Sequence, residues 1–293
     1  MFKRQTSGSV VCSNCGRLVG VNDERCFNCG KWNPGLWGFG PAINRLVRDL
    51  GFMEVVLGVC IVFFLLSYLY GGRPPQGIMS ILSPDMSSLY KFGSSGAFPV
   101  FIGGRWWTVL SAAWLHGGIL HIFMNMMALR QLMPAVAEFF GTSRLVIIYT
   151  FSAAAGFFVT SAVGYFGLFV PGLPGFLRGA PFTVGASAPL LGLCGALVLY
   201  GHRTGSRMLT QQIVRWVIIL VVIGLFVPVM DNWAHIGGFA GGYAVARILD
   251  PMREEKPGHA VAALVCLVLN AGALALSFLL GPSWEELMTG LGR

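Results

Sequence analysis

Long apolar runs, separated by short polar or glycine-rich segments, make up most of the chain. Seven runs with almost no charged residue each predict a helix, at residues 55–70, 113–129, 145–170, 180–200, 216–230, 233–246 and 260–280. A helix needs about 20 apolar residues to cross a bilayer, so flanking residues must complete the shorter runs. The short runs at 180–200 and 233–246 also suggest helices that are buried inside a bundle of the others.

Three segments depart from this apolar pattern. Residues 1–34 form a separate polar piece that ends at Asn33-Pro34-Gly35. Residues 35–53 carry aromatic residues and arginines, which are typical of an interfacial linker. Residues 71–105, between the first two runs, form a loop that is rich in proline and glycine yet also apolar. A loop this long is usually functional, and we expect it to lie in the membrane surface on the outer face.

The composition agrees with a membrane protein. Of the 293 residues, 55% are hydrophobic and only 11% are charged, and the mean hydropathy is +0.70. A soluble globular protein carries about a quarter charged residues, so this chain has too few to cover a water-exposed surface. Because residues 1–50 are polar and the first apolar run is long enough to be a span, we expect no cleavable signal peptide.

The formal net charge of +8 is distributed unevenly. If the N-terminus is cytoplasmic, all but five of the 20 lysines and arginines fall in cytoplasmic segments. The five outer residues are Arg73, Lys91, Arg105, Arg178 and Arg293. Cytoplasmic segments of membrane proteins carry such an excess, so the charge reports orientation, and we expect no nucleic-acid partner. We therefore expect a multi-pass protein with a cytoplasmic N-terminus, in a bacterial inner or plasma membrane.

Four of the 7 cysteines form two copies of one motif, CSNCG at residues 12–16 and CFNCG at residues 26–30. Two such knuckles bring the thiolates of Cys12, Cys15, Cys26 and Cys29 to one tetrahedral site, for which zinc is the usual metal. Two disulfides are the alternative, which a reducing cytoplasm disfavours. Four protein thiolates leave no open coordination position, so we expect one structural, non-catalytic zinc. The other cysteines, which we expect to pack inside helices, are Cys60, Cys194 and Cys266.

A few strongly polar residues lie inside the predicted spans, where they are costly and often functional. His116, His121 and Asn125 occur within WLHGGILHIFMNMMAL, and His121 and Asn125 share a helix face because they are four residues apart. Contacts between helices are the alternative role for Asn125. His235 lies one turn after Asp231, which we expect to cap its helix rather than to act in catalysis.

Ser187, in VGASAPLLGLCG, stands at the head of an apolar run. A serine in a membrane helix more often serves packing than chemistry, so its surroundings decide. A helix start has unpaired N–H groups and a positive dipole that favour developing negative charge, and Gly185 permits close approach of a substrate. Gly238 and Gly242 form a GxxxG motif, which lets a neighbouring helix approach closely. If that neighbour begins at Ser187, His235 can reach its hydroxyl.

The stretches HGGILHIFMN, GAS and AHIGGFAGG occur in this order, and together they resemble the motifs of the rhomboid intramembrane serine proteases. The resemblance covers about residues 54–250, with six helices and a long first outer loop. It implies that Ser187 is the nucleophile and His235 its general base. It also implies that His121, Asn125 and the Ser187 backbone N–H stabilise the oxyanion, while His116 matches the first histidine of its motif.

Three features of the chain depart from the family pattern. Two lie near the serine, where many members have a glycine and a small residue after it and an aromatic ring that packs on the histidine. The third lies in the first loop, where members commonly carry a Trp-Arg pair. The residues found at these places are Ala188-Pro189, Leu191 and Trp107-Thr108, the last with Arg105 nearby. None of the departures removes a group that the resemblance assigns to catalysis.

We therefore expect an all-α polytopic membrane protein, in which a small zinc ribbon precedes a six-helix rhomboid-like bundle and a seventh C-terminal transmembrane helix. The expected divisions are a cytoplasmic ribbon at residues 1–34, an interfacial linker at 35–53, the protease core at 54–250, and the C-terminal helix and tail at 251–293. The expected function is that of an intramembrane serine endopeptidase, which cleaves transmembrane proteins with a Ser–His dyad and needs no cofactor for catalysis.

Two other functions remain open. A rhomboid-like protein can bind transmembrane clients without cutting them, although both dyad residues are present here. A transporter or channel would need intramembrane carboxylates or pore-lining charges, which the predicted spans almost lack. The expected partners are transmembrane substrates and the lipid bilayer, and the zinc ribbon is the place where a cytoplasmic protein partner would bind.

Overall fold

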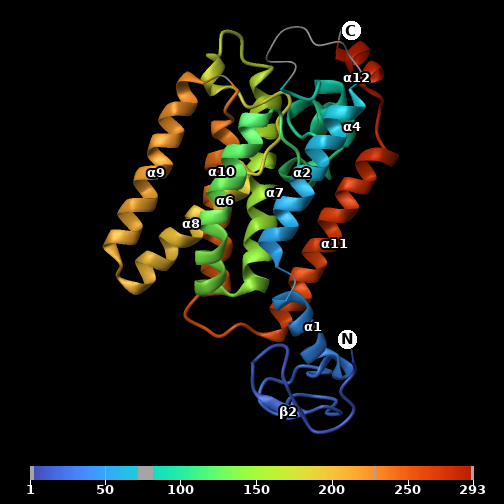
Figure 1. Ribbon diagram of the computed structural model, residues 1–293, viewed down its shortest axis with the longest axis vertical. Coiled ribbons are helices and arrows are strands. Elements are labelled where there is room, and N and C mark those ends of the chain that lie inside the picture. The colour runs from blue at the N-terminus through green and yellow to red at the C-terminus, as the bar shows by residue number, and fades with distance from the viewer. Residues whose placement is uncertain (1–2, 50, 72–81, 228, 292–293) are drawn as a thin grey trace.

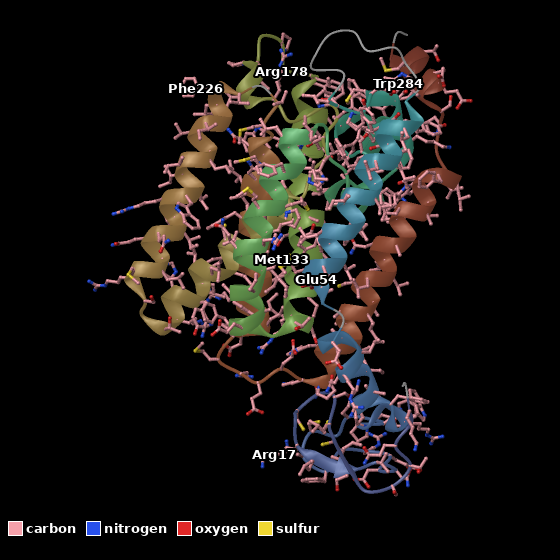
Figure 2. All side chains as sticks on the ribbon, viewed as in Figure 1. Arg17, Glu54, Met133, Arg178, Phe226 and Trp284 are labelled. Carbon is pink, nitrogen blue, oxygen red and sulfur yellow. The ribbon has the colours of Figure 1, made fainter. Side chains whose placement is uncertain are left out.

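The computed structural model describes residues 3–49, 51–71, 82–227 and 229–291. It consists of an elongated helical bundle with a small ribbon at one end (Figure 1). Arg17, in the ribbon, and Trp284, near the C-terminus, lie at opposite ends of the long axis (Figure 2). Within the predicted loop at 71–105, residues 72–81 lie outside the described residues.

The ribbon is built on a two-stranded antiparallel sheet. Strand β1 (Ser9–Val11) pairs with β2 (Leu18–Gly20), and Val10 lies opposite Val19. Both valines are buried, together with Val21 and two of the cysteines. The 3-10 turn η1 (Leu36–Gly38) and helix α1 (Gly40–Arg48) then lead from the ribbon to the bundle (Figure 1). The tiny apolar core indicates that the ribbon needs a further stabilising element.

Seven helices of 18 or more residues are present among the described residues, one for each predicted run. They are α2 (Phe52–Tyr70), α6 (Ile119–Phe140), α7 (Thr142–Gly167), α8 (Ser187–Thr204), α9 (Arg207–Phe226), α10 (Asn232–Leu249) and α11 (Pro257–Leu279). Five of them are long and apolar enough to cross a membrane, namely α2, α6, α7, α9 and α11. The chain is therefore an all-α, multi-pass membrane protein, as the apolar pattern predicted.

The two helices outside that set, α8 and α10, lie in the interior of the bundle. Helix α8 packs against α10, α7, α6 and α9, and every residue from Ala188 to Leu199 is buried. Because its neighbours shield it from lipid, it can be short and still satisfy its backbone polar groups. In contrast, α9 buries only Ile213 and exposes an apolar face at the edge of the bundle (Figure 1).

Two of the predicted helix starts were wrong, and a third helix begins before its apolar run. Residues 113–118 are not part of α6, because the backbone is extended at Leu115 and Gly118 and the chain turns there. Residues 180–186 are not part of α8, since Thr183 pairs with Ser95 in an antiparallel bridge. Helix α9 begins at Arg207 rather than at residue 216, because the Ser206 side chain caps it by accepting from the Leu209 N–H.

Short helices fill the segment between α2 and α6. They are α4 (Met86–Phe92), the π-helical turn η2 (Phe98–Ile102), α5 (Thr108–Ser111) and the 3-10 turn η3 (Ala112–Trp114). Two further short elements are η4 (Gly175–Leu177), before α8, and α12 (Trp284–Leu291), after α11.

Arg105 lies in the loop between α2 and α6, with 1% of its surface exposed. Its guanidinium donates to the carbonyls of Tyr90 at 2.6 Å and Ser277 at 2.7 Å, which fastens the loop to α11.

Candidate active site and metal centre

Ser187 is the first residue of α8, and a tightly packed glycine precedes it. Gly185 has a φ of 136°, a conformation that favours glycine, and its N–H donates to the Ala112 carbonyl at 2.9 Å. A Cβ on Gly185 would lie 2.7 Å from the His121 ring. The chain therefore enters α8 directly beside His121.

His235 is positioned by the start of α10. The Asp231 carboxylate accepts from the Ala234 N–H at 3.0 Å and from the Thr160 hydroxyl at 2.8 Å, so it caps α10 and joins it to α7. The His235 N–H donates to the Asp231 carbonyl at 3.1 Å, in the first turn of the helix. Asp231 is thus the N-cap residue of α10, in agreement with the role expected from the sequence.

Helices α8 and α10 meet at glycines. A Cβ on Gly238 would overlap the carbonyl of Ala188, and one on Gly242 would overlap the backbone of Gly192. Gly156 of α7 packs as closely against α10. Only residues without a side chain allow backbones to come this near, so these glycines set the separation of the helices that carry Ser187 and His235.

This packing brings Ser187 and His235 within hydrogen-bond distance. The Ser187 Oγ lies 2.9 Å from the His235 Nε2, although the two residues are 48 positions apart. His235 is 4% exposed, and its Nδ1 has no hydrogen-bond partner among the described residues. An Nδ1–H tautomer leaves Nε2 free to accept the serine proton, and no carboxylate is needed to explain the pair.

His116 and His121 contact the residues just before α8, and Asn125 lies one turn after His121 on α6. The His116 Nε2 accepts from the Ala186 N–H at 3.4 Å, and the rings of His116 and His121 lie 5.1 Å apart. The Asn125 Nδ2 donates to the His121 carbonyl at 2.8 Å, one turn back on the same helix. One N–H of that amide is therefore used within α6, and its second N–H remains for another acceptor.

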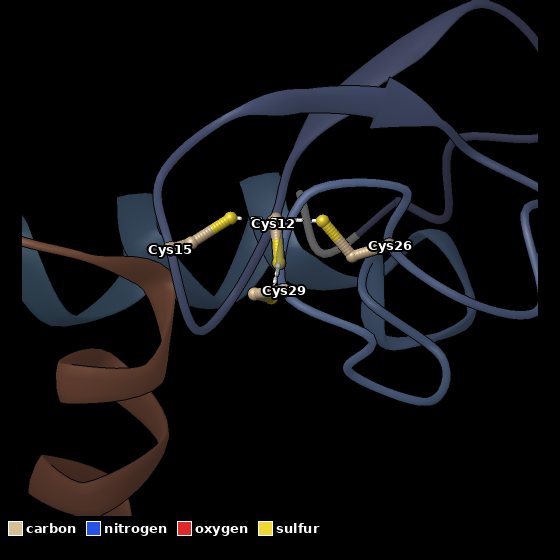
Figure 3. Close-up of side chains that lie close together, drawn as sticks. All are labelled: Cys12, Cys15, Cys26 and Cys29. Atoms are coloured by element: carbon tan, nitrogen blue, oxygen red, sulfur yellow. Dashed lines mark hydrogen bonds between the residues drawn. The ribbon is translucent and has the colours of Figure 1, made fainter.

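The four N-terminal cysteines converge on one point (Figure 3). Their sulfur atoms all lie within 4.8 Å of one another, with Cys12 and Cys29 at 3.8 Å and Cys15 and Cys26 at 3.6 Å. A tetrahedral zinc site with Zn–S bonds of about 2.3 Å has sulfur atoms about 3.8 Å apart, so the arrangement fits such a metal. It does not fit the alternative of two disulfides, whose sulfur atoms are about 2 Å apart.

The backbone around the cysteines favours thiolates in part of the cluster. The Arg17 N–H lowers the pKa of Cys15 to about 6, and the Lys31 N–H lowers the pKa of Cys29. Burial instead raises the pKa of Cys12 to about 11. A bound cation would offset this effect of burial on the pKa of Cys12, because thiol ligands of a metal are deprotonated. The donor set therefore suits a soft divalent cation.

An aromatic cluster near the C-terminus was not foreseen. The Trp284 ring lies 5.4 Å from the ring of Phe182, which precedes Ser187 by five residues, and 5.7 Å from that of Tyr90. The Tyr90 hydroxyl donates to the Pro282 carbonyl at 2.9 Å. These contacts tie α12 to the segment that leads into α8. No local pattern in the sequence pairs these rings, because they come from three segments far apart in the chain.

Comparison with known protein families shows the family to which the chain belongs. The Rhomboid domain profile matches residues 103–251, about half of the chain. The chain belongs to the rhomboid family. The resemblance inferred from the three sequence motifs is therefore confirmed, as is the all-α fold class that it implied.

Similar rhomboid proteins differ in the activity that their names state. The chain is 30% identical over 243 residues to "Rhomboid protease GluP" of Bacillus subtilis, covering 80% of this chain and 42% of that protein. It is 31% identical over 173 residues to "RHOMBOID-like protein 4" of Arabidopsis thaliana, covering 58% and 40%. It is 28% identical over 182 residues to "Inactive RHOMBOID-like protein 8" of the same plant, covering 61% and 49%. The chain spans about half the length of the curated relatives it matches.

Proposed function

We propose that this rhomboid protein is an intramembrane serine endopeptidase with Ser187 as nucleophile and His235 as general base. The observation that carries the proposal is the 2.9 Å distance between the Ser187 Oγ and the His235 Nε2 inside the bundle. Two polar groups in a glycine-packed interior are costly unless they are paired, and a serine–imidazole pair is a nucleophile with its base. The proposal also draws on the family and on its protease relative.

The geometry suits the two steps of acyl transfer. His235 takes the Ser187 proton through Nε2 as the Oγ attacks the substrate carbonyl, and it then returns that proton to the leaving amine. The C–N bond breaks and an acyl-enzyme remains. Water, deprotonated by His235, then attacks the ester, and the proton returns to Ser187 as the new carboxyl group leaves.

The oxyanion would form beside the first turn of α8. The Ser187 N–H, at the positive end of the helix dipole, is the first donor. The His121 ring, packed against Gly185, and the second N–H of Asn125 are the other donors. Because these groups are held by packing, they need little rearrangement as charge develops, which is the condition for strong transition-state stabilisation.

The cysteine ribbon has a structural role in this proposal. Cys12, Cys15, Cys26 and Cys29 hold one zinc, which supplies cross-linking and no chemistry because four thiolates leave no open position. The proposed divisions are the ribbon at 1–34, the interfacial linker at 35–53, the protease core at 54–250, and the additional helix and tail at 251–293. Transmembrane proteins are the proposed substrates, and a cytoplasmic N-terminus is the proposed orientation.

The alternative function is client binding without cleavage, which the inactive Arabidopsis relative keeps open. A fluorophosphonate probe separates the two functions, because it reacts with an activated serine and not with an ordinary hydroxyl. We expect the probe to label the purified protein at Ser187, as located by mass spectrometry of the labelled peptide. Labelling should disappear in His235→Ala. An unlabelled wild-type protein that still retains a transmembrane client would support client binding instead.

A further inference from the structure

The ribbon packs against the first turn of α11 in the bundle. The Ser13 carbonyl, inside the first cysteine knuckle, accepts from the Gly258 N–H at 3.0 Å. A Cβ on Gly258 would overlap that carbonyl, so the contact is tight. Ser13 is also held by its own N–H, which donates to the Pro34 carbonyl at 2.9 Å. The ribbon and α11 therefore form one surface at this point.

A cavity of about 390 Å³ lies at this junction, which we call the ribbon–α11 cleft. Its volume is in the range of about 300–1,000 Å³ that is usual for small-ligand sites. Its polar walls include Lys31 from the ribbon, Lys256 from the residue before α11, and Ser13. Among the described residues, no acid lines it, and neither lysine makes an ion pair.

Glu255, the acidic residue that directly precedes Lys256, is bound outside the cleft. The Glu255 carboxylate accepts from the Arg144 N–H at 3.0 Å, at the start of α7. It therefore serves α7 and does not neutralise Lys256 in the cleft. Two ammonium groups in one cleft repel each other unless an anion lies between them. The charge pattern of the cleft thus favours a negatively charged ligand.

Two further groups in the cleft are hydrogen-bond donors. Ser13 is 7% exposed, and its hydroxyl has no hydrogen-bond partner among the described residues. A buried polar atom without a partner is uncommon and calls for an explanation such as a missing ligand. The His259 Nδ1 accepts from the Lys256 N–H at 3.1 Å, so a neutral ring carries its proton on Nε2 and donates from there.

The position of the cleft relative to the membrane suggests where such an anion comes from. Helix α11 has 23 residues, about 35 Å at 1.5 Å per residue. The hydrocarbon core of a bilayer is about 30 Å thick, so the first turn of α11 lies near the level of the lipid headgroups. Leu36 and Val261 supply an apolar wall to the same cleft, as a bound lipid would require.

We propose that the ribbon–α11 cleft binds a phosphate group, held by Lys31, Lys256 and the Ser13 hydroxyl. The phosphate belongs either to the headgroup of an anionic phospholipid or to a small free phosphate. The site is separate from Ser187 and His235, and the proposal does not depend on proteolysis. It gives the ribbon a function beyond folding, since the ribbon supplies half of a binding site at the membrane surface.

The test measures ligand binding by the full-length, zinc-loaded protein in a non-ionic detergent. Native mass spectrometry follows the titration with phosphatidylglycerol, and a parallel arm uses inorganic phosphate alone. The cleft variant is Lys31→Gln/Lys256→Gln. The matched control is Lys3→Gln/Arg17→Gln, which removes the same charge from exposed ribbon positions. Zinc content, measured on each protein, verifies that the ribbon remains folded.

We expect the cleft variant to bind phosphatidylglycerol about tenfold more weakly than wild type, because each lysine near a lipid phosphate contributes appreciably to binding. The control should stay within about twofold of wild type. Ser13→Ala should also weaken binding, whereas Ser7→Ala, at an exposed position, should not. If only inorganic phosphate distinguishes the cleft variant from the control, the ligand is a free phosphate. If neither ligand distinguishes them, the proposal is wrong.

Discussion

The ribbon and the bundle hold their polar groups in place by different means. The hydrophobic core of the ribbon consists only of Val10, Val19, Val21 and two cysteines, so we expect its geometry to depend on a metal bound by the four cysteines. The bundle brings Ser187 and His235 together through glycine contacts between α8 and α10. A small module can be held by one metal, whereas an intramembrane polar pair depends on how closely backbones fit.

The two means predict opposite responses to substitution. A change to the fit within the bundle should alter activity and stability together, because the helices that carry the site move. A change to the ribbon should alter metal content and leave the site where it is. The following four predictions test this contrast, from the largest expected effect to the smallest.

Asn125→Ala should lower the cleavage rate by about 10²–10³, the usual cost of losing one oxyanion donor. The KM for a transmembrane test substrate should change little, because the lost interaction forms only in the transition state. The substitution also removes the hydrogen bond to the His121 carbonyl, so thermal unfolding serves as the control for folding. A rate within about threefold of wild type would exclude Asn125 from the oxyanion site.

Arg105→Met should lower the free energy of unfolding by on the order of 3 kcal/mol, because it leaves the buried Tyr90 and Ser277 carbonyls without a donor. Methionine keeps much of the apolar stem, so the loss reports the hydrogen bonds rather than a large cavity. Thermal unfolding in detergent measures the effect. Trp107→Phe, in the same loop, is the matched control and should cost clearly less.

Gly242→Ala should destabilise the bundle by about 1–3 kcal/mol, because the added methyl overlaps the Gly192 backbone and forces α8 and α10 apart. Activity should fall with stability, since Ser187 and His235 separate. The matched control is Gly272→Ala in α11, where nothing lies within 4 Å of the new methyl. Equal behaviour of the two variants would show that the glycine contact does not position the site.

Deletion of residues 1–34 should remove about one zinc per chain and leave the cleavage rate in detergent within about twofold of wild type. The ribbon contacts α1 and α11, and the candidate site is built from α6, α8 and α10. Metal analysis and a detergent assay on the intact and truncated proteins measure both quantities. A collapse of the rate while the bundle still unfolds cooperatively would mean that the ribbon acts across the membrane through α11.

Much of this architecture could be predicted from the sequence. The apolar runs located all seven long helices, and the doubled CxxC motif identified the cysteine cluster. Helix starts were the weak point, because hydropathy cannot register the bridge between Ser95 and Thr183, which lies just before α8. The sequence motifs predicted that Ser187 and His235 lie on helices that meet. The GxxxG motif made this prediction possible, because it is a local signal of close helix packing.

The contacts between segments far apart in the chain could not be predicted. The departure from the Trp-Arg pattern left the anchoring of the first loop open, and the structure shows that Arg105 is buried and joins that loop to α11. Its partners are backbone carbonyls, which carry no sequence signature. The contact of Trp284 with Phe182 and that of Ser13 with Gly258 also escaped prediction, because each joins segments far apart in the chain that no local pattern pairs.

Cleavage of a purified transmembrane substrate by Ser187→Ala, compared with Ser152→Ala, tests the central claim most directly. Ser152 is a buried serine of α7 whose hydroxyl has no hydrogen-bond partner among the described residues, so it controls for the loss of a hydroxyl inside the bundle. We predict that Ser187→Ala remains folded and gives no detectable product, while Ser152→Ala cleaves at nearly the wild-type rate. Continued cleavage by Ser187→Ala at a rate comparable to that of Ser152→Ala would contradict the assignment of Ser187 as the nucleophile.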